Sequence, residues 1–184
     1  METQILDKRI DYDGSQLHSH FALFEADIVG DSMVAFFGSA NVNEANLVDL
    51  IDHKSSNTIV AKEMLHFIVE HFPADLTLAV FRQRLLVAIA RETLVQHCNC
   101  AIERRGDDLF AKDRKLTVSI ATISPVSTLI HFGVNIFPEG APVPAIGLAE
   151  LQVDSREFAE DLMRRVDQEL EGIARSIVKV RAVQ

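Results

Sequence analysis

The sequence predicts an α+β domain in which a mainly antiparallel, mixed central sheet packs against helices. Three features favour this class: apolar residues at helical spacing in several long segments, a run of short β-rich segments in the middle of the chain, and one long amphipathic segment near its end. The chain has 184 residues, of which 48% are hydrophobic, and no repeat or linker-like stretch divides it. Residues 1–184 are therefore expected to form a single domain with its own core.

The first half of the chain is expected to hold two strands and three helices. The apolar residues 21–37 predict two strands around the turn Gly30-Asp31-Ser32, because glycine tolerates a positive φ. A capping-box spacing of Asn41 and Glu44 predicts a short helix over 44–53. The spacing of apolar residues then predicts a second helix over 59–72 and a third over 81–98.

The second half is expected to form a meander of short strands followed by a long helix. Asp154 and Glu157 have capping-box spacing and predict that this helix begins at about Ser155. Its apolar stripe is expected to pack on the sheet, although the same stripe could equally join copies of the chain into a homo-oligomer. The strands are expected within residues 101–102, 109–110, 116–123 and 129–137, which turn residues separate from one another.

The net charge, the apolar runs and the first residues of the chain narrow the class of function. A formal net charge of −9 argues against a nucleic-acid partner, because phosphate binding depends on basic patches. No apolar run approaches the roughly 20 residues that span a bilayer, and the first residues lack an apolar signal-peptide core, so a cytoplasmic protein without a membrane partner is expected. Cys98 and Cys100 are too close in sequence to favour an ordinary disulfide, which agrees with a reducing compartment.

The residues with the clearest chemistry lie between Arg104 and Asn135. Gly106 is followed by two carboxylates, Asp107 and Asp108, which could bind a cation or a ribose hydroxyl at a turn. Lys115 begins a strand, and residues that alternate along a strand share a face. We therefore expect Lys115, Thr117, Ser119 and Ala121 on one face of this strand, and His131, Gly133 and Asn135 on one face of the next.

Pairing of these two strands would place Lys115, Ser119, His131 and Asn135 on one concave surface. A lone ammonium in such a place can hold a carboxylate or phosphate and stabilise negative charge as it develops. The same residues also fit a plainer interpretation, in which Asp113-Arg114-Lys115 is a solvated turn and Ser119 reflects ordinary strand composition. From the residues alone, both interpretations stay open.

This segment resembles the central motif of the biotin/lipoate protein ligase superfamily. In the resemblance, Lys115 matches the lysine that binds the acyl-adenylate, and Asp107-Asp108 matches an Asn-Asp pair, with Asp107 departing from Asn. Ser119 matches the serine that follows the lysine in lipoate ligases. The matching residues are Gly106-Asp107-Asp108-Leu109, Asp113-Arg114-Lys115-Leu116-Thr117-Val118-Ser119, His131-Phe132-Gly133 and Asn135.

The whole chain is similar to the uncharacterised family called domain of unknown function 366, through Gly30-Asp31-Ser32, the run from Gln83 to Leu86 and the run from Lys115 to Thr122. Together the two resemblances imply a ligase-type fold and a catalytic role for Lys115. They imply ATP and Mg²⁺ as cofactors and a small-molecule carboxylate or a nucleotide as partner. In this assignment Asp107 and Asp108 hold Mg²⁺ or ribose. The acyl group lies among Ser119, His131, Gly133 and Asn135.

The chain also departs from the ligase pattern. The glycine-rich ligase segments are absent, and residues 35–40 contain only Gly38. Val118 stands where lipoate ligases keep a glycine, so biotin and lipoate are not the expected ligands. The alternatives are an ATP-dependent ligase or acyltransferase for another acid, a non-catalytic module that binds a nucleotide or small molecule, and an oligomeric structural protein.

A metal site is not expected. His97-Cys98-Asn99-Cys100 contains both cysteines of the chain, and no second cysteine pair exists to complete a zinc site. Two small residues at the end of an apolar helix are more typical of packing than of metal binding.

Overall fold

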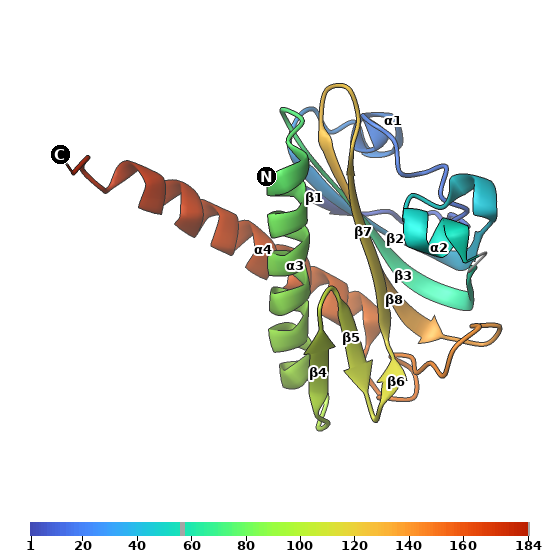
Figure 1. Ribbon diagram of the computed structural model, residues 1–184. Helices are drawn as coiled ribbons and strands as arrows, with labels where there is room; N and C mark the ends of the chain where they lie inside the picture. The colour runs from blue at the N-terminus through green and yellow to red at the C-terminus, as the bar shows by residue number, and fades with distance from the viewer. Residues whose placement is uncertain (56–57, 184) are drawn as a thin grey trace.

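The computed structural model describes residues 1–55 and 58–183 and contains a five-stranded sheet in the order β1-β2-β3-β8-β7 (Figure 1). β1 and β2 run parallel, and the other neighbouring strands of this sheet are antiparallel. A smaller antiparallel sheet has the order β4-β5-β6. The predicted α+β class with a mixed, mainly antiparallel sheet is therefore confirmed. The strands are β1 (Glu2–Ile5), β2 (Ser32–Val42), β3 (Ile59–His71), β4 (Ile102–Arg105), β5 (Asp108–Ala111), β6 (Arg114–Lys115), β7 (Thr117–Ile123) and β8 (Thr128–Phe137).

Two long helices cover one face of the large sheet. Alternate residues of β3 and β8, such as Phe67 and Phe132, point to this face and form the main core with apolar residues of α3 and α4. The outer half of α4 extends away from the rest of the protein (Figure 1), and from Glu171 onward its described residues are exposed. The homo-oligomer expected from its apolar stripe stays a prediction. The helices are α1 (Phe21–Ala26), the 3-10 helix η1 (Glu44–Asn46), α2 (Leu50–Lys54), α3 (Leu76–His97) and α4 (Ser155–Val178).

The helix predicted over 59–72 was wrong, because this segment is strand β3. β3 pairs with β2 on one side and β8 on the other, and its residues from Met64 to His71 are buried. A strand buried on both faces loses the apolar-polar alternation that would identify it, and its apolar residues then also fit a helical spacing. The pairing with β2 and β8 decides the conformation.

The first predicted strand within 21–37 was also wrong, because residues 21–26 form the short helix α1. Gly30, with φ 104°, precedes β2, which is the only strand of this segment. The helix predicted over 44–53 is divided into η1 and α2. The side chain of Asp49 caps α2 by accepting hydrogen bonds from the backbone N–H groups of Ile51 and Asp52.

The meander and both long helices were predicted correctly in kind. α3 begins at Leu76, several residues before the predicted start, where Asp75 accepts a hydrogen bond from the backbone of Leu78. α4 begins at Ser155 as predicted, and Asp154 caps it. Among the described residues, no helix is long and apolar enough to cross a membrane.

Candidate functional site

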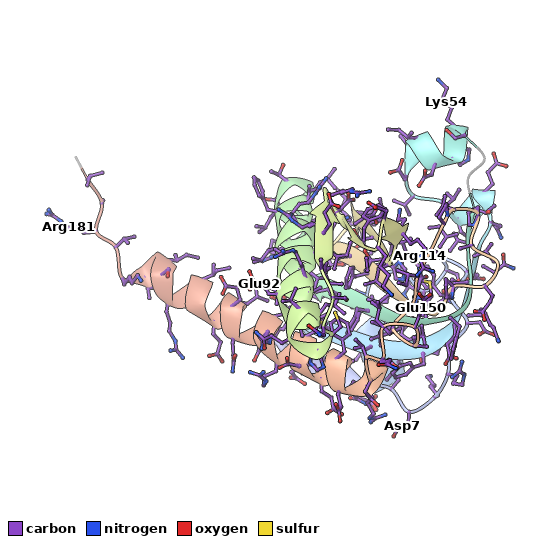
Figure 2. All side chains as sticks on the ribbon, turned by 90° about the horizontal axis from the view of Figure 1, so that it is seen from below. Asp7, Lys54, Glu92, Arg114, Glu150 and Arg181 are labelled. Carbon is purple, nitrogen blue, oxygen red and sulfur yellow. The ribbon has the colours of Figure 1, made fainter. Side chains whose placement is uncertain are left out.

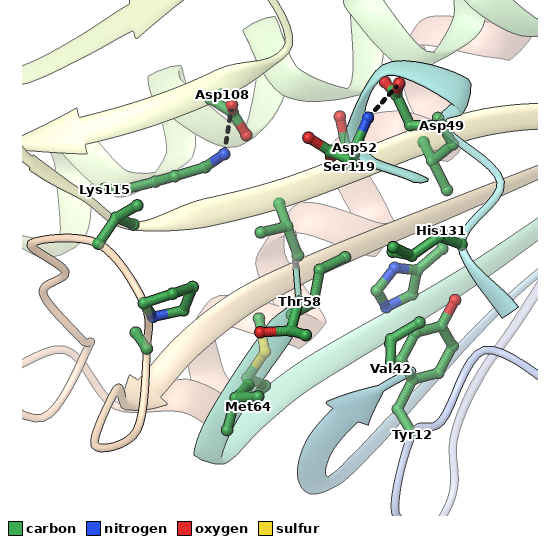
Figure 3. Close-up of a pocket in the computed structure, with 18 of the residues that line it drawn as sticks. Tyr12, Val42, Asp49, Asp52, Thr58, Met64, Asp108, Lys115, Ser119 and His131 are labelled. Carbon is green, nitrogen blue, oxygen red and sulfur yellow. Dashed lines mark hydrogen bonds and ion pairs between the residues drawn. The ribbon is translucent and has the colours of Figure 1, made fainter. Parts of the chain in front are cut away.

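A cavity of about 430 Å³ opens on the face of the sheet that α3 and α4 leave uncovered. Its floor is formed by β3, β7 and β8, and Figure 3 shows many of the side chains that line it. The segment with η1 and α2 borders it on one side, and β6 with residues 141–145 borders it on another. Lys115, in the middle of the motif found in the sequence, and Asn135, at its end, therefore line one cavity.

Lys115 lies at one end of this cavity and forms an ion pair with Asp108. Lys115 Nζ is 2.7 Å from Asp108 Oδ2, and both side chains are partly exposed. Burial raises the pKa of Asp108, although Lys115 acts in the opposite direction and Asp107 adds to the rise. The carboxyl group of Asp108 therefore takes up a proton more readily than an ordinary aspartate.

The backbone of Lys115 is held by three neighbouring segments. Lys115 pairs with Phe110 in the small sheet, and its N–H and C=O bond to Pro144 and Ile146. The amide of Asn135 donates to the carbonyl of Lys115 over 3.3 Å. Asn135 therefore contributes to the position of Lys115 as well as to the cavity wall.

The neighbouring Arg114 anchors the same turn from the outside. Its guanidinium makes two hydrogen bonds to the carboxylate of Glu150, at the base of the segment that leads into α4 (Figure 2). A bidentate arginine-carboxylate pair has a fixed geometry, so it restricts how β6 can move. Lys115 is thus presented from a constrained strand.

The carboxylates of Asp107 and Asp108 point to different partners. Asp107 Oδ2 accepts a hydrogen bond from Gln83 Nε2 over 3.1 Å, and Arg84 lies 3.5 Å from its other oxygen. Ser119 Oγ donates to the carbonyl of Asp107 and accepts from Gln83. Asp107 and Ser119 border the cavity, but these contacts tie the β4–β5 turn to α3.

The prediction that Lys115 begins the strand of Thr117, Ser119 and Ala121 was wrong, although these three residues do alternate along β7. Lys115 belongs to β6 in the small sheet, and β7 begins only at Thr117, so the two residues do not continue one strand. In β7 the residues opposite Gly133 and His131 are Val118 and Ile120. Ser119 stands opposite Phe132 instead, and Thr117 Oγ1 accepts a hydrogen bond from the backbone N–H of Leu109.

The floor of the cavity contains two buried histidines. His131 Nε2 is 3.1 Å from Nδ1 of His66, and the ring of Tyr12 stacks on His131 with centroids 3.9 Å apart. Burial lowers the pKa of His66 to about 4 and lowers that of His131 well below its ordinary value. Both imidazoles are therefore neutral at pH 7, so His131 forms an aromatic floor and carries no charge.

Gly133 keeps this floor open. A Cβ at Gly133 would lie 2.8 Å from Met64 Cε, 3.1 Å from Val118 Cγ2 and 3.2 Å from His131 Cε1. Any larger residue would displace groups that line the cavity, which explains the glycine found in the motif.

Tyr12 is a cavity residue that the sequence did not reveal. Its segment lies beside β2, where Tyr12 bridges to Ala40. This approach depends on Gly38, since a Cβ there would lie 1.9 Å from the carbonyl oxygen of Ile10. Gly38 and the single tyrosine of the chain were the available signals, but only the fold brings them together.

Asp49 and Asp52, on the segment of α2, also line the cavity. Lys115 is the only lysine or arginine that lines the cavity among the described residues, whereas four aspartates do so. Those aspartates are Asp49, Asp52, Asp107 and Asp108.

The cysteines lie elsewhere. Cys98 and Cys100 are free, half-buried and packed against the main core beside α3. Burial raises the pKa of Cys100 to about 11, with the neighbouring Cys98 adding to the rise, which disfavours a reactive thiolate. Within residues 1–55 and 58–183, no group of three or more histidine, cysteine or acidic side chains is placed to hold a metal ion.

The arrangement of strands and helices is that of biotin and lipoate protein ligase catalytic domains, which are among the structural neighbours of this chain. One of them is the biotin protein ligase from Aquifex aeolicus in complex with biotin and ATP. It is 14% identical, has a TM-score of 0.56, and the match covers 93% of this chain and 69% of that one. At this identity the likeness shows the fold.

The chain belongs to the family described as Domain of unknown function (DUF366), whose model matches residues 1–181. It is 38% identical to the uncharacterized protein MJ0805 of Methanocaldococcus jannaschii over 170 residues, which are 86% of this chain and 76% of the relative. A solved structure of a protein of unknown function from Pyrococcus horikoshi is 41% identical. That match has a TM-score of 0.94 and covers 100% of this chain and 99% of the other. Both family resemblances drawn from the sequence are thus confirmed.

Proposed function

We propose that the protein binds a small-molecule carboxylate in this cavity, with the carboxylate group at Lys115. The observation that carries the proposal is the Lys115 ammonium, which lies at the cavity end with its side chain 29% exposed. An ammonium has three N–H donors, and Asp108 accepts from one side only. Because burial already disfavours the charged form of Asp108, a ligand carboxylate can compete with it for Lys115.

The rest of the cavity suits the carbon skeleton of such an acid. Val42, Met64, Val118 and Ile120 contribute apolar surface, and the neutral ring of His131 lies beneath them. Small-molecule sites combine apolar lining residues with placed polar groups, and this cavity contains both. The carboxylate would fix the orientation of the ligand, and the apolar wall would set its length and shape.

ATP-dependent activation of the acid is the second candidate function, favoured by the likeness of fold to a ligase that binds biotin and ATP. In such a reaction the carboxylate attacks the α-phosphate of ATP and releases pyrophosphate, and an acceptor then displaces AMP from the acyl-adenylate. The residues of this cavity do not fit a free triphosphate, since one lysine faces four aspartates among the described lining residues. Mg²⁺ would have to be held without a cluster of three ligating side chains, which the described residues lack.

The test measures ligand binding in three proteins by calorimetry and by thermal unfolding. The wild type, Lys115→Ala and Lys112→Ala are titrated with alkanoic acids of increasing length, with biotin and with lipoic acid. Lys112 is the matched control, because it is an exposed lysine of the same hairpin that pairs with Glu150 outside the cavity. A ligand that binds the folded state raises the melting temperature with its saturation.

At least one acid is expected to raise the melting temperature of the wild type and of Lys112→Ala, and to lose most of this effect in Lys115→Ala. Equal shifts in all three proteins would show that Lys115 is not the carboxylate site, and no shift with any acid would refute the proposal. Exchange of labelled pyrophosphate into ATP, dependent on one acid, would establish the second candidate.

A further inference from the structure

The cavity has a second polar feature at the end opposite Lys115. Figure 3 shows Tyr12 and Lys115 on opposite sides of the close-up, with Met64 and Thr58 between them. Tyr12 is 4% exposed, and its ring is fixed by stacking on both His131 and His66. Its hydroxyl is therefore held in one direction by rings that cannot easily move.

The Tyr12 hydroxyl has no hydrogen-bond partner among residues 1–55 and 58–183. The hydroxyl is not one of the buried side-chain atoms that lack a partner, so it is accessible from the cavity that Tyr12 lines, and a ligand that covers it must replace its contact with water. Burial also raises the pKa of Tyr12, so the group keeps its proton at neutral pH and can both donate and accept. Nearby, Nδ1 of His66 contacts His131 and Asn135 bonds to Lys115, whereas Nε2 of His66 is buried without a partner among the described residues.

The charges around the cavity restrict what this hydroxyl can receive. Asp49 and Asp52 line the cavity from α2, and the carboxylate of Asp49 is fixed as the cap of that helix. A second carboxylate on the ligand would face these aspartates. Among the described lining residues, Lys115 is the only lysine or arginine, so no other cation could pair with that carboxylate. A hydroxyl, an amide or a protonated amine meets no such repulsion.

We propose that the ligand is a bifunctional acid, with its carboxylate at Lys115 and a neutral or cationic hydrogen-bonding group at its other end, where Tyr12 receives it. This inference rests on the proposed function, because it assigns the second end of the same ligand. It also gives the unpartnered hydroxyl a purpose: a plain hydrocarbon tail would leave Tyr12 unsatisfied, whereas a distal hydroxyl or amine would complete its hydrogen bonding.

The probes are four matched series of acids of increasing chain length: unsubstituted alkanoates, ω-hydroxy acids, ω-amino acids and α,ω-diacids. Affinities are measured by calorimetry on the wild type and on Tyr12→Phe, which keeps the stacked ring and removes only the hydroxyl. At one chain length the ω-hydroxy or ω-amino acid is expected to bind roughly three- to tenfold more tightly than the alkanoate, as one net hydrogen bond predicts. Tyr12→Phe should abolish this preference, because it removes the hydroxyl that receives the distal group.

A second pair of variants tests the exclusion of diacids. Asp49→Asn removes the charge but keeps the helix cap, because asparagine caps helices about as well as aspartate. Asp27→Asn is the control, since Asp27 ends α1 and does not line the cavity. Asp49→Asn is expected to improve diacid binding severalfold relative to the alkanoate, and Asp27→Asn is expected to change nothing.

The outcomes separate this inference from the proposed function. If alkanoates bind through Lys115 but no substituted series gains affinity, or if Tyr12→Phe keeps the gain, the bifunctional ligand is refuted and the carboxylate site stands. If diacids bind best to the wild type, the charge argument fails. If no member of any series binds, both proposals fail together.

Discussion

The two faces of the large sheet are built from the same strands but differ in what they bury. Toward α3 and α4, β3 and β8 place Phe67, Leu65, Phe132 and Val134 in a core of apolar side chains. Toward the cavity, the intervening positions carry His66, His131 and Asn135, and Tyr12 stacks on the two histidines.

The difference shows how stability and function are divided within single strands. Hydrocarbon packing gains free energy from every buried methylene group, so the helix-covered face stabilises the fold. Buried imidazoles, an amide and a phenol gain little unless each finds a partner. The cavity face therefore tolerates polar groups for which stability alone gives no reason, and this makes it the face to test for binding.

Removal of a ring from the helix-covered face should produce the largest effect. Phe132 is fully buried and lies beside Phe67 with ring centroids 6.0 Å apart. Phe132→Ala is expected to lower the free energy of unfolding by about 3–5 kcal/mol, because it leaves a cavity in close-packed surroundings. Phe137→Ala, at the exposed end of the same strand, is the control and should cost much less. Urea unfolding measures both, and equal losses would contradict the proposed division.

The neighbouring residue on the other face should give a smaller effect with a different signature. His131→Phe keeps a ring for Tyr12 to stack on but leaves Nδ1 of His66 without its partner. The loss is expected to be about 1–3 kcal/mol, the cost of one unsatisfied buried polar group.

A double-mutant cycle with His66→Phe identifies the cause of that loss. Replacement of both histidines removes both polar groups, so the double variant should be more stable than the sum of the single effects predicts. Strictly additive losses would mean that the two rings contribute through packing alone.

The strands illustrate how much of the fold could be predicted from the sequence. β7, β8 and α4 were found because turn residues, alternation and a capping aspartate are local signals. β3 was taken for a helix because both its faces are buried, and only its pairing with β2 and β8 excludes the helical spacing. A sequence pattern indicates which residues are buried. It distinguishes a helix from a strand only when one face of the element stays polar.

The candidate site, too, could be predicted from the sequence only in part. Lys115 and Asp108 were found because they lie in one hairpin, and their ion pair needs only a local turn. Tyr12 was missed because its place depends on contact between two distant segments at Gly38. The break between β6 and β7 at Leu116 changed which side chains share a face, and no residue pattern in this stretch announces that break.

The pH dependence of the free energy of unfolding gives a third test of the cavity face, with a smaller expected effect. Burial lowers the pKa of His66 from 6.5 to about 4 and that of His131 well below 6.5. As the pH falls below 6.5, the unfolded chain takes up protons at these residues while the folded chain does not, so the free energy of unfolding falls. Each histidine contributes up to about 1.4 kcal/mol per pH unit within this window.

The double variant His66→Phe/His131→Phe should therefore lose less stability than the wild type between neutral pH and about pH 4. A slope should remain, since burial also lowers the pKa of His71 to about 4. Asp108 acts with the opposite sign because its pKa is raised, and it is present in both proteins, so its contribution cancels from the difference. Urea unfolding at several pH values measures the two slopes. If they are equal, His66 and His131 are protonated in the folded protein, and the neutral floor assigned to the cavity is wrong.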